Sequence, residues 1–165
     1  MLKRLWLPLR LFPRNRMVED IKIIDGGLAV DDRGSIIFAN SFNFENVKRF
    51  YQLENFSTDT VRAWHGHAQE GKYVFVNNGS IILGIVPLDN MANPSKSNVV
   101  TRLILSSRIP KIVYIPPGHA NGFRAIEDNT KITFFSSSNL EESQGDDHRY
   151  PYDYWGKDIW EVENR

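Results

Sequence analysis

The sequence of 165 residues contains no cysteine. This absence excludes a disulfide scaffold, a thiolate nucleophile, a zinc finger and an iron–sulfur cluster. The chain also lacks an excess of either charge, because 20 Lys and Arg residues balance 20 Asp and Glu residues. A neutral total gives no global electrostatic support for binding to a nucleic-acid polymer, so any anionic partner must be met by cations placed locally. The residues left for chemistry are His, Asp, Glu, Lys, Tyr and Arg.

Long apolar runs are also missing. Near the amino terminus the longest uncharged run is Leu5–Leu9, which is far shorter than the ~20 residues of a membrane-spanning helix. Pro8 and Pro13 interrupt the apolar stretch and no small-residue cleavage site follows it, so it does not resemble a signal peptide. We therefore predict a basic N-terminal arm over residues 1–17, a single domain over residues 18–165, a cytoplasmic location and no membrane span.

The chain has no long internal repeat and no glycine-rich nucleotide-binding signature. Short segments rich in Ile, Val, Phe and Tyr recur instead, and turn residues separate them. This pattern is typical of an all-β barrel or sandwich rather than of alternating strands and helices. The predicted strands are Ile21–Ile24, Ser35–Ala39, Lys48–Leu53, Val61–His65, Lys72–Val76, Ile81–Val86, Val99–Leu105, Lys111–Ile115 and Lys131–Ser136.

One turn allows a closer prediction. Asn78-Gly79 is a strong hairpin signal because both residue types tolerate positive φ, so the strand Lys72–Val76 is predicted to form a hairpin with the strand that follows. Side chains alternate along a strand, which puts Lys72 on one face with Val74 and Val76. Either this face looks into the barrel and carries a buried cation, or the aromatic face is the buried one and the cation is solvated.

His65-Gly66-His67 resembles the first motif of the cupin superfamily, in which HxH is followed by a metal-binding Glu and then by a Gly. Counting back from Gly79, the Glu position falls on Lys72. The second cupin motif, Pro-x-Gly-x-x-His, matches Pro116–Asn121, with Asn121 in place of its histidine. The resemblance implies an all-β double-stranded β-helix, the jelly-roll barrel of cupins. The lost ligands imply that no metal is bound, because a lysine repels a divalent cation.

Four stretches follow a common pattern in their order and spacing: Asp31–Ser35, Val61–His65 with Lys72, Ile115–Phe123, and Asp153 followed by Trp160. Together, over residues 18–162, they resemble the dTDP-4-dehydrorhamnose 3,5-epimerase family. The resemblance implies an isomerase of nucleotide-sugar biosynthesis that needs no cofactor and takes a dTDP-sugar as its substrate. It also implies a homodimer in which strands are exchanged between the subunits.

The implied chemistry can be matched to individual residues. Epimerising a carbon next to a ketone requires a base that titrates near neutrality and a fixed positive partner for the enolate oxygen. His65 fits the base, Asp153 is predicted to orient its imidazole, and Lys72 is predicted to stabilise the oxyanion. By resemblance, Arg62 binds the substrate, and Arg33 reaches the diphosphate or the sugar from the neighbouring subunit.

Three further residues are predicted to contact the substrate, namely His67, His119 and Asn121. His119 stands two residues before Asn121, so the two side chains share a strand face. Arg62 and His65 pose a parity problem, because residues three apart on an ideal strand face opposite sides. Both can line one site only if the strand contains a bulge or Arg62 lies at its twisted end.

The chain departs from the family pattern at the catalytic Tyr, whose position falls at Asn139 or Leu140. Tyr150, Tyr152 and Tyr154 are the candidates to replace it. Aromatic clusters near the end of a chain more often pack in a core or an interface, so a second-face acid for epimerisation is missing from the sequence pattern.

Two other functions stay open. The stretch Arg62–His67 also resembles the Arg-Gly-x-His-x-His pattern of related cupins that move the ketone between C3 and C4 of dTDP-sugars. A non-catalytic sugar-nucleotide-binding cupin is favoured by the missing Tyr and by Ala63 in the position of a family Gly. Retention of the Arg, His, Lys and Asp set opposes that reading. Both enzymatic reactions pass through an enolate or enediol, so they share a first step.

Overall fold

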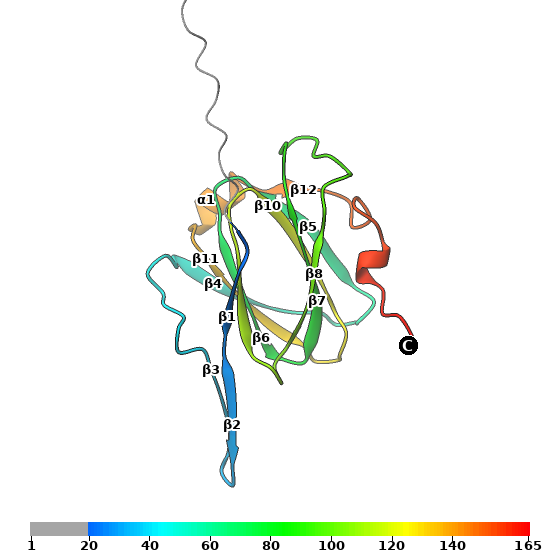
Figure 1. Cartoon of the computed structure of the whole chain (residues 1–165). Helices are drawn as coiled ribbons and strands as arrows, with labels where there is room; N and C mark the ends of the chain where they lie inside the picture. Colours follow the sequence, from blue (N-terminus) through cyan, green and yellow to red (C-terminus); the bar gives the residue numbers. More distant parts are fainter. Residues whose placement is uncertain (1–19) are drawn as a thin grey trace, which may run out of the picture.

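The computed structural model describes residues 20–165, whose regular structure is almost entirely strand (Figure 1). The basic arm expected over residues 1–17 lies outside the described residues. No helix within residues 20–165 has the length and apolar character needed to cross a membrane. The elements are β1 Lys22–Asp25, β2 Gly27–Asp31, β3 Gly34–Phe38, β4 Arg49–Glu54, β5 Val61–His67, β6 Lys72–Asn78, β7 Ser80–Pro87, β8 Thr101–Ser106, β9 Lys111–Ile115, β10 His119–Ala125, β11 Lys131–Ser136, α1 Leu140–Gln144, β12 His148–Arg149 and a 3-10 turn at Asp158–Trp160.

Two five-stranded antiparallel sheets face each other (Figure 1). The first sheet has the order β1-β9-β6-β11-β4, and the second has the order β12-β5-β10-β7-β8. From β4 to β12, nearly every step along the chain crosses from one sheet to the other. This winding is that of a double-stranded β-helix, so the structure confirms the all-β jelly-roll barrel.

A third, two-stranded sheet stands apart from the barrel. It is the hairpin of β2 and β3, which projects beyond one end of the two sheets (Figure 1). Its apolar side chains are largely exposed, with Val30 at 73% and Ile36 at 65%. The hairpin therefore carries apolar surface that the described chain does not cover.

The predicted hairpin between β6 and β7 is wrong. Its turn forms as expected, with Gly79 at a φ of +77°, but β6 pairs with β9 and β11, whereas β7 pairs with β8 and β10. The reason is that β7 is buried on both faces and occupies an inner position of the second sheet. The alternation along β6 does hold. Val74 and Val76 face the barrel interior and Lys72 lies with them, which decides the orientation that the sequence left open.

The second sheet is covered on its two faces by different partners. Its inner face packs against the first sheet around residues such as Leu83. Its outer face is covered by the C-terminal segment, residues 150–160, which buries Trp64 and Trp160 together. The indole Nε1 atoms of both tryptophans donate to the carbonyl oxygen of Tyr152, at 3.1 and 2.9 Å. These contacts fix the C-terminal segment on the outside of the barrel.

Candidate active site

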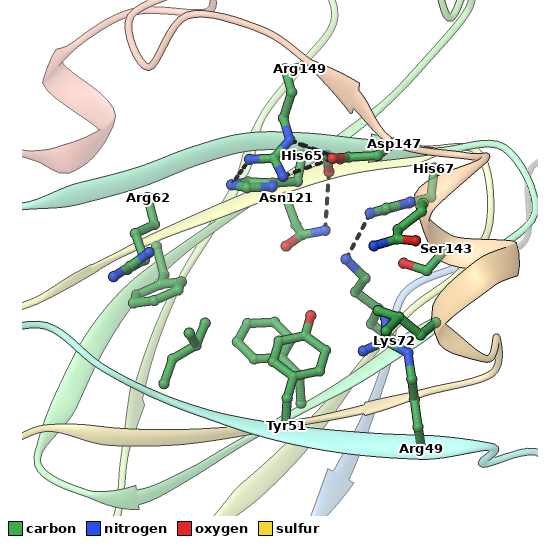
Figure 2. Close-up of a pocket in the computed structure, with 15 residues that line it drawn as sticks. Arg49, Tyr51, Arg62, His65, His67, Lys72, Asn121, Ser143, Asp147 and Arg149 are labelled. Atoms are coloured by element: carbon green, nitrogen blue, oxygen red, sulfur yellow. Dashed lines mark hydrogen bonds and ion pairs between the residues drawn. The ribbon is translucent and has the colours of Figure 1, made fainter.

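A pocket of about 350 Å³ opens at one end of the space between the two sheets (Figure 2). Its walls come from β4, β6 and β11 of the first sheet and from β5 and β10 of the second, and α1 with the residues after it closes one side. The charged or titratable lining residues are Arg49, Arg62, His65, His67, Lys72, Asp147 and Arg149, and the apolar and aromatic ones include Tyr51, Leu53, Phe123, Phe134 and Leu140.

An irregularity in β5 brings Arg62 and His65 to the same pocket. On β10, the partner of Arg62 is Phe123. The partner of His65 is Asn121, so two residues of β5 oppose the single Gly122. A bulge of this kind adds one residue to one strand and restores the parity of the side chains. Gly122 allows it, since a Cβ there would lie 2.3 Å from a Cβ of β5. Both side chains line the pocket as a result.

Lys72 is directed at His67 inside the barrel. Its Nζ lies 2.7 Å from Nε2 of His67, and the two residues are only 6% and 4% exposed. Burial lowers the pKa of Lys72 below its ordinary value. Burial and then the charge of Lys72 lower the pKa of His67. An ammonium at this distance occupies the space in front of Nε2, so these residues do not fit the metal ion of other cupins.

Glu70 lies behind His67 with a fully buried side chain. Its Oε2 is 3.1 Å from Nδ1 of His67, in an ion-pair contact rather than an aligned hydrogen bond, and 3.7 Å from Nζ of Lys72. Its Oε1 accepts from Nη2 of Arg49 at 3.2 Å. Motif spacing does not point to Glu70, because the residue lies in the loop between β5 and β6 and not at a motif position. One buried carboxylate therefore serves an imidazole and two cations.

His65 has a different environment, formed by the residues after α1. Nη1 of Arg149 lies 3.4 Å from Nε2 of His65, and Arg149 is itself paired with Asp147 at 2.7 Å (Figure 2). Burial, and after it the charge of Arg149, lowers the pKa of His65 to about 4. His65 is therefore neutral at pH 7, and its imidazole can accept a proton. The sequence pattern contains no signal for Arg149 or Asp147, because β12 has only two residues.

Tyr51 is a residue of the pocket that the sequence reasoning missed. It comes from β4 and projects its hydroxyl into the pocket from the side opposite His65 and His67 (Figure 2). Its ring stacks on Phe134 with a centroid distance of 5.3 Å, and the Arg49 guanidinium lies 5.0 Å from the ring centroid. Burial raises the pKa of the Tyr51 hydroxyl, so it remains protonated at neutral pH. Alternation along β4, which puts Tyr51 on the same face as Leu53, is the signal that could have found it.

Residues 15–151 match the family described as dTDP-4-dehydrorhamnose 3,5-epimerase. The chain belongs to this family. The family places the protein among the isomerases. No curated protein sequence matches the chain.

Solved structures share the fold. A 3,4-ketoisomerase from Helicobacter canadensis has a TM-score of 0.60 at 20% identity, covering 82% of this chain and 95% of that chain. The dTDP-4-dehydrorhamnose 3,5-epimerase of Bacillus anthracis, with TDP and PPi bound, has a TM-score of 0.65 at 21% identity, covering 79% and 78%. A 3'-monoepimerase from Streptomyces bikiniensis, in complex with dTDP-quinovose, has a TM-score of 0.67 at 15% identity, covering 83% and 73%. Solved structures of this fold therefore include proteins with more than one reaction, and the fold alone does not distinguish between them.

Asp153 does not meet His65 in this structure. It lies in an exposed turn after β12, outside the lining of the pocket in the described chain, and the family match ends at residue 151. The cause is the outer tryptophan cluster. Trp64 precedes His65 on β5 and faces the opposite side of the sheet, and its indole binds the carbonyl oxygen of Tyr152. Asp153 is therefore held on the outer face, whereas His65 faces the pocket.

The tyrosines considered as replacements for the family's catalytic Tyr also lie on that outer side. The hydroxyl of Tyr150 donates to the carbonyl oxygen of Met91 at 2.6 Å, and that of Tyr154 donates to Pro94 at 2.8 Å. Among residues 20–165, the pocket lining includes neither of them, nor Tyr152. The cluster packs the C-terminal segment, and the phenol available to the pocket is that of Tyr51.

The remaining predicted binding residues divide into two groups. Arg62 and Asn121 line the pocket; Nε of Arg62 donates to Oδ1 of Asn55 at 2.7 Å. His119 is buried with Nδ1 3.2 Å from the carbonyl oxygen of Pro116, and it is outside the set of described residues that line the pocket. Arg33 is at the tip of the projecting β2–β3 hairpin, where it pairs with Asp31. The structure therefore brings Arg62, His65, His67, Lys72 and Asn121 together, and it leaves Arg33, His119 and Asp153 outside.

Proposed function

We propose that the protein isomerises a dTDP-4-keto-6-deoxyhexose by removing a proton from the carbon beside the 4-keto group. The observation that carries this proposal is the contact between Lys72 and His67 within one pocket. A neutral imidazole beside a fixed cation meets both needs of enolate chemistry, because the imidazole takes the proton and the cation stabilises the oxygen that becomes negative. The TDP and dTDP-quinovose bound by structurally similar proteins support a dTDP-sugar as the substrate.

The contacts favour His67 as the base. The sequence assigns that role to His65, but the carboxylate whose charge acts on His65 is that of Asp147, which is engaged by Arg149. His67 has Glu70 at 3.1 Å from its other ring nitrogen, and a carboxylate in that position stabilises an imidazolium. When the substrate binds, its carbonyl oxygen takes over the hydrogen bond of Lys72, which frees Nε2 of His67 for the C–H bond. His65 then lies on the same wall to bind the sugar oxygens.

The arrangement favours migration of the ketone, which is the 3,4-ketoisomerase reaction. In that reaction a base takes the proton from C3, and the electron pair forms an enediolate across C3 and C4. The protonated base exchanges with solvent and then delivers a proton to C4. The proton of the C3 hydroxyl moves to the oxygen on C4. One base on one wall is sufficient to move a proton from C3 to C4. His67, the proposed base, is the second His of the ketoisomerase-like pattern. Asp153, the feature that favoured the epimerase, is outside the pocket.

Tyr51 keeps epimerisation as a second candidate. Inverting a carbon requires a base on one face of the sugar and a proton donor on the other. The Tyr51 hydroxyl projects from the wall opposite His67, and its raised pKa keeps its proton in place at neutral pH (Figure 2). In a ketoisomerase the same hydroxyl would pass the proton between the two sugar oxygens. The pose of the sugar decides between these two roles.

Arg62 is the proposed contact for the diphosphate. Arg49 and Arg149 are ion-paired with Glu70 and Asp147, whereas Arg62 is hydrogen-bonded through Nε to the neutral amide of Asn55. Its terminal nitrogens can therefore bind an anion without breaking an ion pair with an acid among the described residues. Guanidinium groups bind phosphate oxygens in this way, with two parallel hydrogen bonds.

Product analysis in D2O tests the proposal. The purified protein is incubated with dTDP-4-keto-6-deoxyglucose, and the sugar is followed by 1H and 13C NMR. A ketoisomerase yields a 3-keto sugar with deuterium at C4, whereas an epimerase yields a 4-keto sugar with deuterium and inverted configuration at C3 or C5. Binding without deuterium incorporation, with this sugar and with other 4-keto nucleotide sugars, would leave the non-catalytic cupin as the correct function.

We also infer a homodimer in which Arg33 serves the partner's pocket. The projecting hairpin with exposed Val30 and Ile36 supports this inference, because apolar surface of this kind is normally covered. Light scattering should give twice the chain mass of 19.1 kDa. A monomer at assay concentration would exclude a role for Arg33 in a partner's site.

A further inference from the structure

Glu70 is an acid in the interior of the barrel, and its contacts indicate a role beyond stabilising the imidazolium of His67. Its side chain is fully buried, so its charge must be stabilised by the groups around it. Oε1 accepts from Oγ of Ser136 at 2.5 Å as well as from Arg49, and Oε2 accepts from Oγ of Ser143 at 2.9 Å. The remaining contacts of Oε2 are with His67 and Lys72, which both line the pocket.

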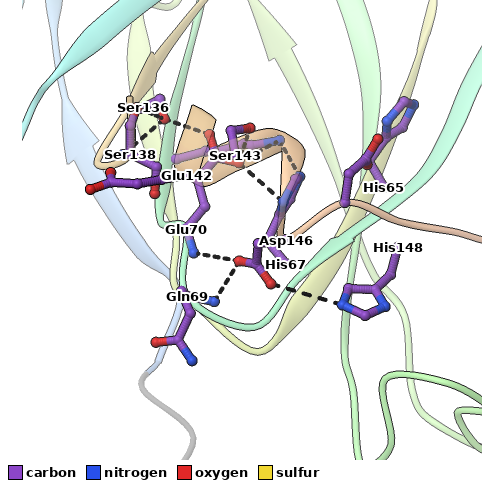
Figure 3. Close-up of polar contacts among 12 residues, drawn as sticks. His65, His67, Gln69, Glu70, Ser136, Ser138, Glu142, Ser143, Asp146 and His148 are labelled. Atoms are coloured by element: carbon purple, nitrogen blue, oxygen red, sulfur yellow. Dashed lines mark hydrogen bonds and ion pairs between the residues drawn. The ribbon is translucent and has the colours of Figure 1, made fainter. Parts of the chain in front are cut away.

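The loop that carries Glu70 is held in place by Asp146. The two carboxylate oxygens of Asp146 accept hydrogen bonds from three consecutive backbone amides, those of Ala68, Gln69 and Glu70, at 2.8, 2.7 and 3.1 Å (Figure 3). Asp146 is itself only 9% exposed. A carboxylate with three aligned donors holds the loop firmly, so the position of Glu70 beneath His67 is a built feature of the fold.

We propose that Glu70 is the positioning residue of the active site, which keeps the proton of His67 on Nδ1 and leaves the lone pair of Nε2 facing the pocket and Lys72. The geometry requires this division. As an ammonium, Lys72 can only donate. Nε2 at 2.7 Å then accepts, and the proton of a neutral imidazole is on Nδ1, beside the carboxylate. The role in proton transfer rests on the proposed function, in which Nε2 of His67 is the base.

Glu70→Gln is an incisive test because Arg49 dictates how the new amide must point. Arg49 only donates, so the amide oxygen must stay in the position of Oε1. The NH2 group then takes the position of Oε2 and donates towards Nδ1 of His67. His67 must move its proton to Nε2, which removes the lone pair that the base requires and opposes the ammonium of Lys72.

The tautomer can be read directly by two-bond 1H–15N NMR of the histidine rings at pH 7, with His67 assigned by the loss of its signals in His67→Gln. We expect the Nδ1–H form in the wild-type protein and the Nε2–H form in Glu70→Gln. Exchange of the substrate proton should fall about 100-fold in the variant, while KM changes less than threefold. Glu70→Asp should keep the Nδ1–H form and recover part of the rate, and Glu54→Gln, a surface change at the far end of β4, should alter neither.

Either of two results would overturn the role of Glu70: an Nε2–H tautomer in the wild-type protein, or an unchanged Nδ1–H tautomer in Glu70→Gln. The first requires no variant, so it decides the matter even if Glu70→Gln does not fold. The NMR readout requires no substrate. A wild-type protein that has the Nδ1–H form but exchanges no proton of a 4-keto sugar would refute the proposed function and leave the positioning of His67 by Glu70 in place.

Discussion

The two faces of the second sheet differ in the surroundings that they give to neighbouring residues of β5. On the outer face, Trp64 packs with Trp160, and both indole nitrogens donate to the same carbonyl oxygen. On the inner face, His65 begins a region in which cations, imidazoles and carboxylates are gathered around an open pocket. The outer face is apolar and fully satisfied, which stabilises the fold. The inner face gathers titratable groups away from water, which is costly for stability and useful for chemistry.

The contrast also explains why Asp153 lies away from His65 in this structure. A segment that ends a chain lies wherever its largest apolar residues can be buried, and here Trp160 and Tyr150 are buried on the outer face. Asp153 accompanies them and is exposed there. The carboxylate that serves the imidazole comes instead from the β5–β6 loop, which Asp146 fastens in place.

The largest expected effect is on the outer face. Trp160→Ala should lower the free energy of unfolding by about 3–5 kcal/mol, because it removes a fully buried indole and leaves a cavity. Urea unfolding monitored by circular dichroism measures this loss. The rate of proton exchange per folded molecule should stay within threefold of the wild type, because the pocket lies on the other face. If Trp160→Ala lowered the exchange rate by much more than threefold and left the free energy of unfolding unchanged, the two faces would not be separate in function.

A pH dependence of stability should come from the inner face. The pKa of His65 is about 4 in the folded protein against an ordinary value of 6.5, so between these values the unfolded chain binds a proton that the folded one does not. The contribution of neutral His65 to the free energy of unfolding should therefore be fully present above pH 6.5. The free energy of unfolding should fall as the pH drops towards 4, by at most about 1.4 kcal/mol per pH unit and less with solvent screening. His65→Gln should flatten this slope in urea titrations, whereas Trp160→Ala should not. Parallel pH profiles of wild type and His65→Gln would refute the burial of a neutral His65.

Arg62 and Arg102 are a matched pair of arginines, one at the pocket on the inner face of the second sheet and one at the C-terminal segment on its outer face. Arg62→Ala should raise KM about tenfold with little change in kcat, because a charge-assisted hydrogen bond to the substrate is worth about 1.5 kcal/mol or more. Arg102 donates to the carbonyl oxygens of Ile159 and Glu161 and holds the C-terminal segment instead. Arg102→Ala should lower stability and leave KM unchanged. A raised KM in Arg102→Ala, or none in Arg62→Ala, would contradict the proposed diphosphate contact.

The smallest effect is expected at Asp153. Because it is exposed on the outer turn, Asp153→Asn should change neither kcat nor KM by more than twofold, and stability should change by about 0.5 kcal/mol or less. Steady-state kinetics of Asp153→Asn and Glu70→Gln, measured under the same conditions, gives a direct comparison of the two acids. A loss of activity in Asp153→Asn as large as in Glu70→Gln would instead support Asp153 as the carboxylate partner of the catalytic histidine.

Much of the barrel was predictable because strands are local features. Short segments rich in Ile, Val, Phe and Tyr mark β4, β6 and β11, and the cupin-like motifs place His65, His67 and Lys72 near one another in the fold. β10 escapes prediction because His119–Gly122 contains Ala, Asn and Gly, which have low strand propensity, and the strand is selected by its partners β5 and β7.

The parts that could not be predicted depend on contacts between distant segments. The turn at Gly79 looks like a hairpin in the sequence, but pairing across the sheet separates its strands. Tyr51 reaches the pocket from a facing strand, and Glu70 reaches His67 from a loop. Neither position carries a motif. The contact between Glu70 and Arg49 joins residues 21 apart in sequence, and that between Asp146 and Gln69 joins residues 77 apart. Only the closed barrel brings them together.

Solvent deuterium incorporation into dTDP-4-keto-6-deoxyglucose, compared between the wild-type protein and His67→Ala, tests the central claim most directly. We expect deuterium at C4 of a 3-keto product with the wild-type protein, and a rate lower by about 1,000-fold with His67→Ala, because a general base contributes about 10²–10⁴-fold. Undiminished incorporation in the folded His67→Ala variant would contradict the account, because the proton would then be removed by another group.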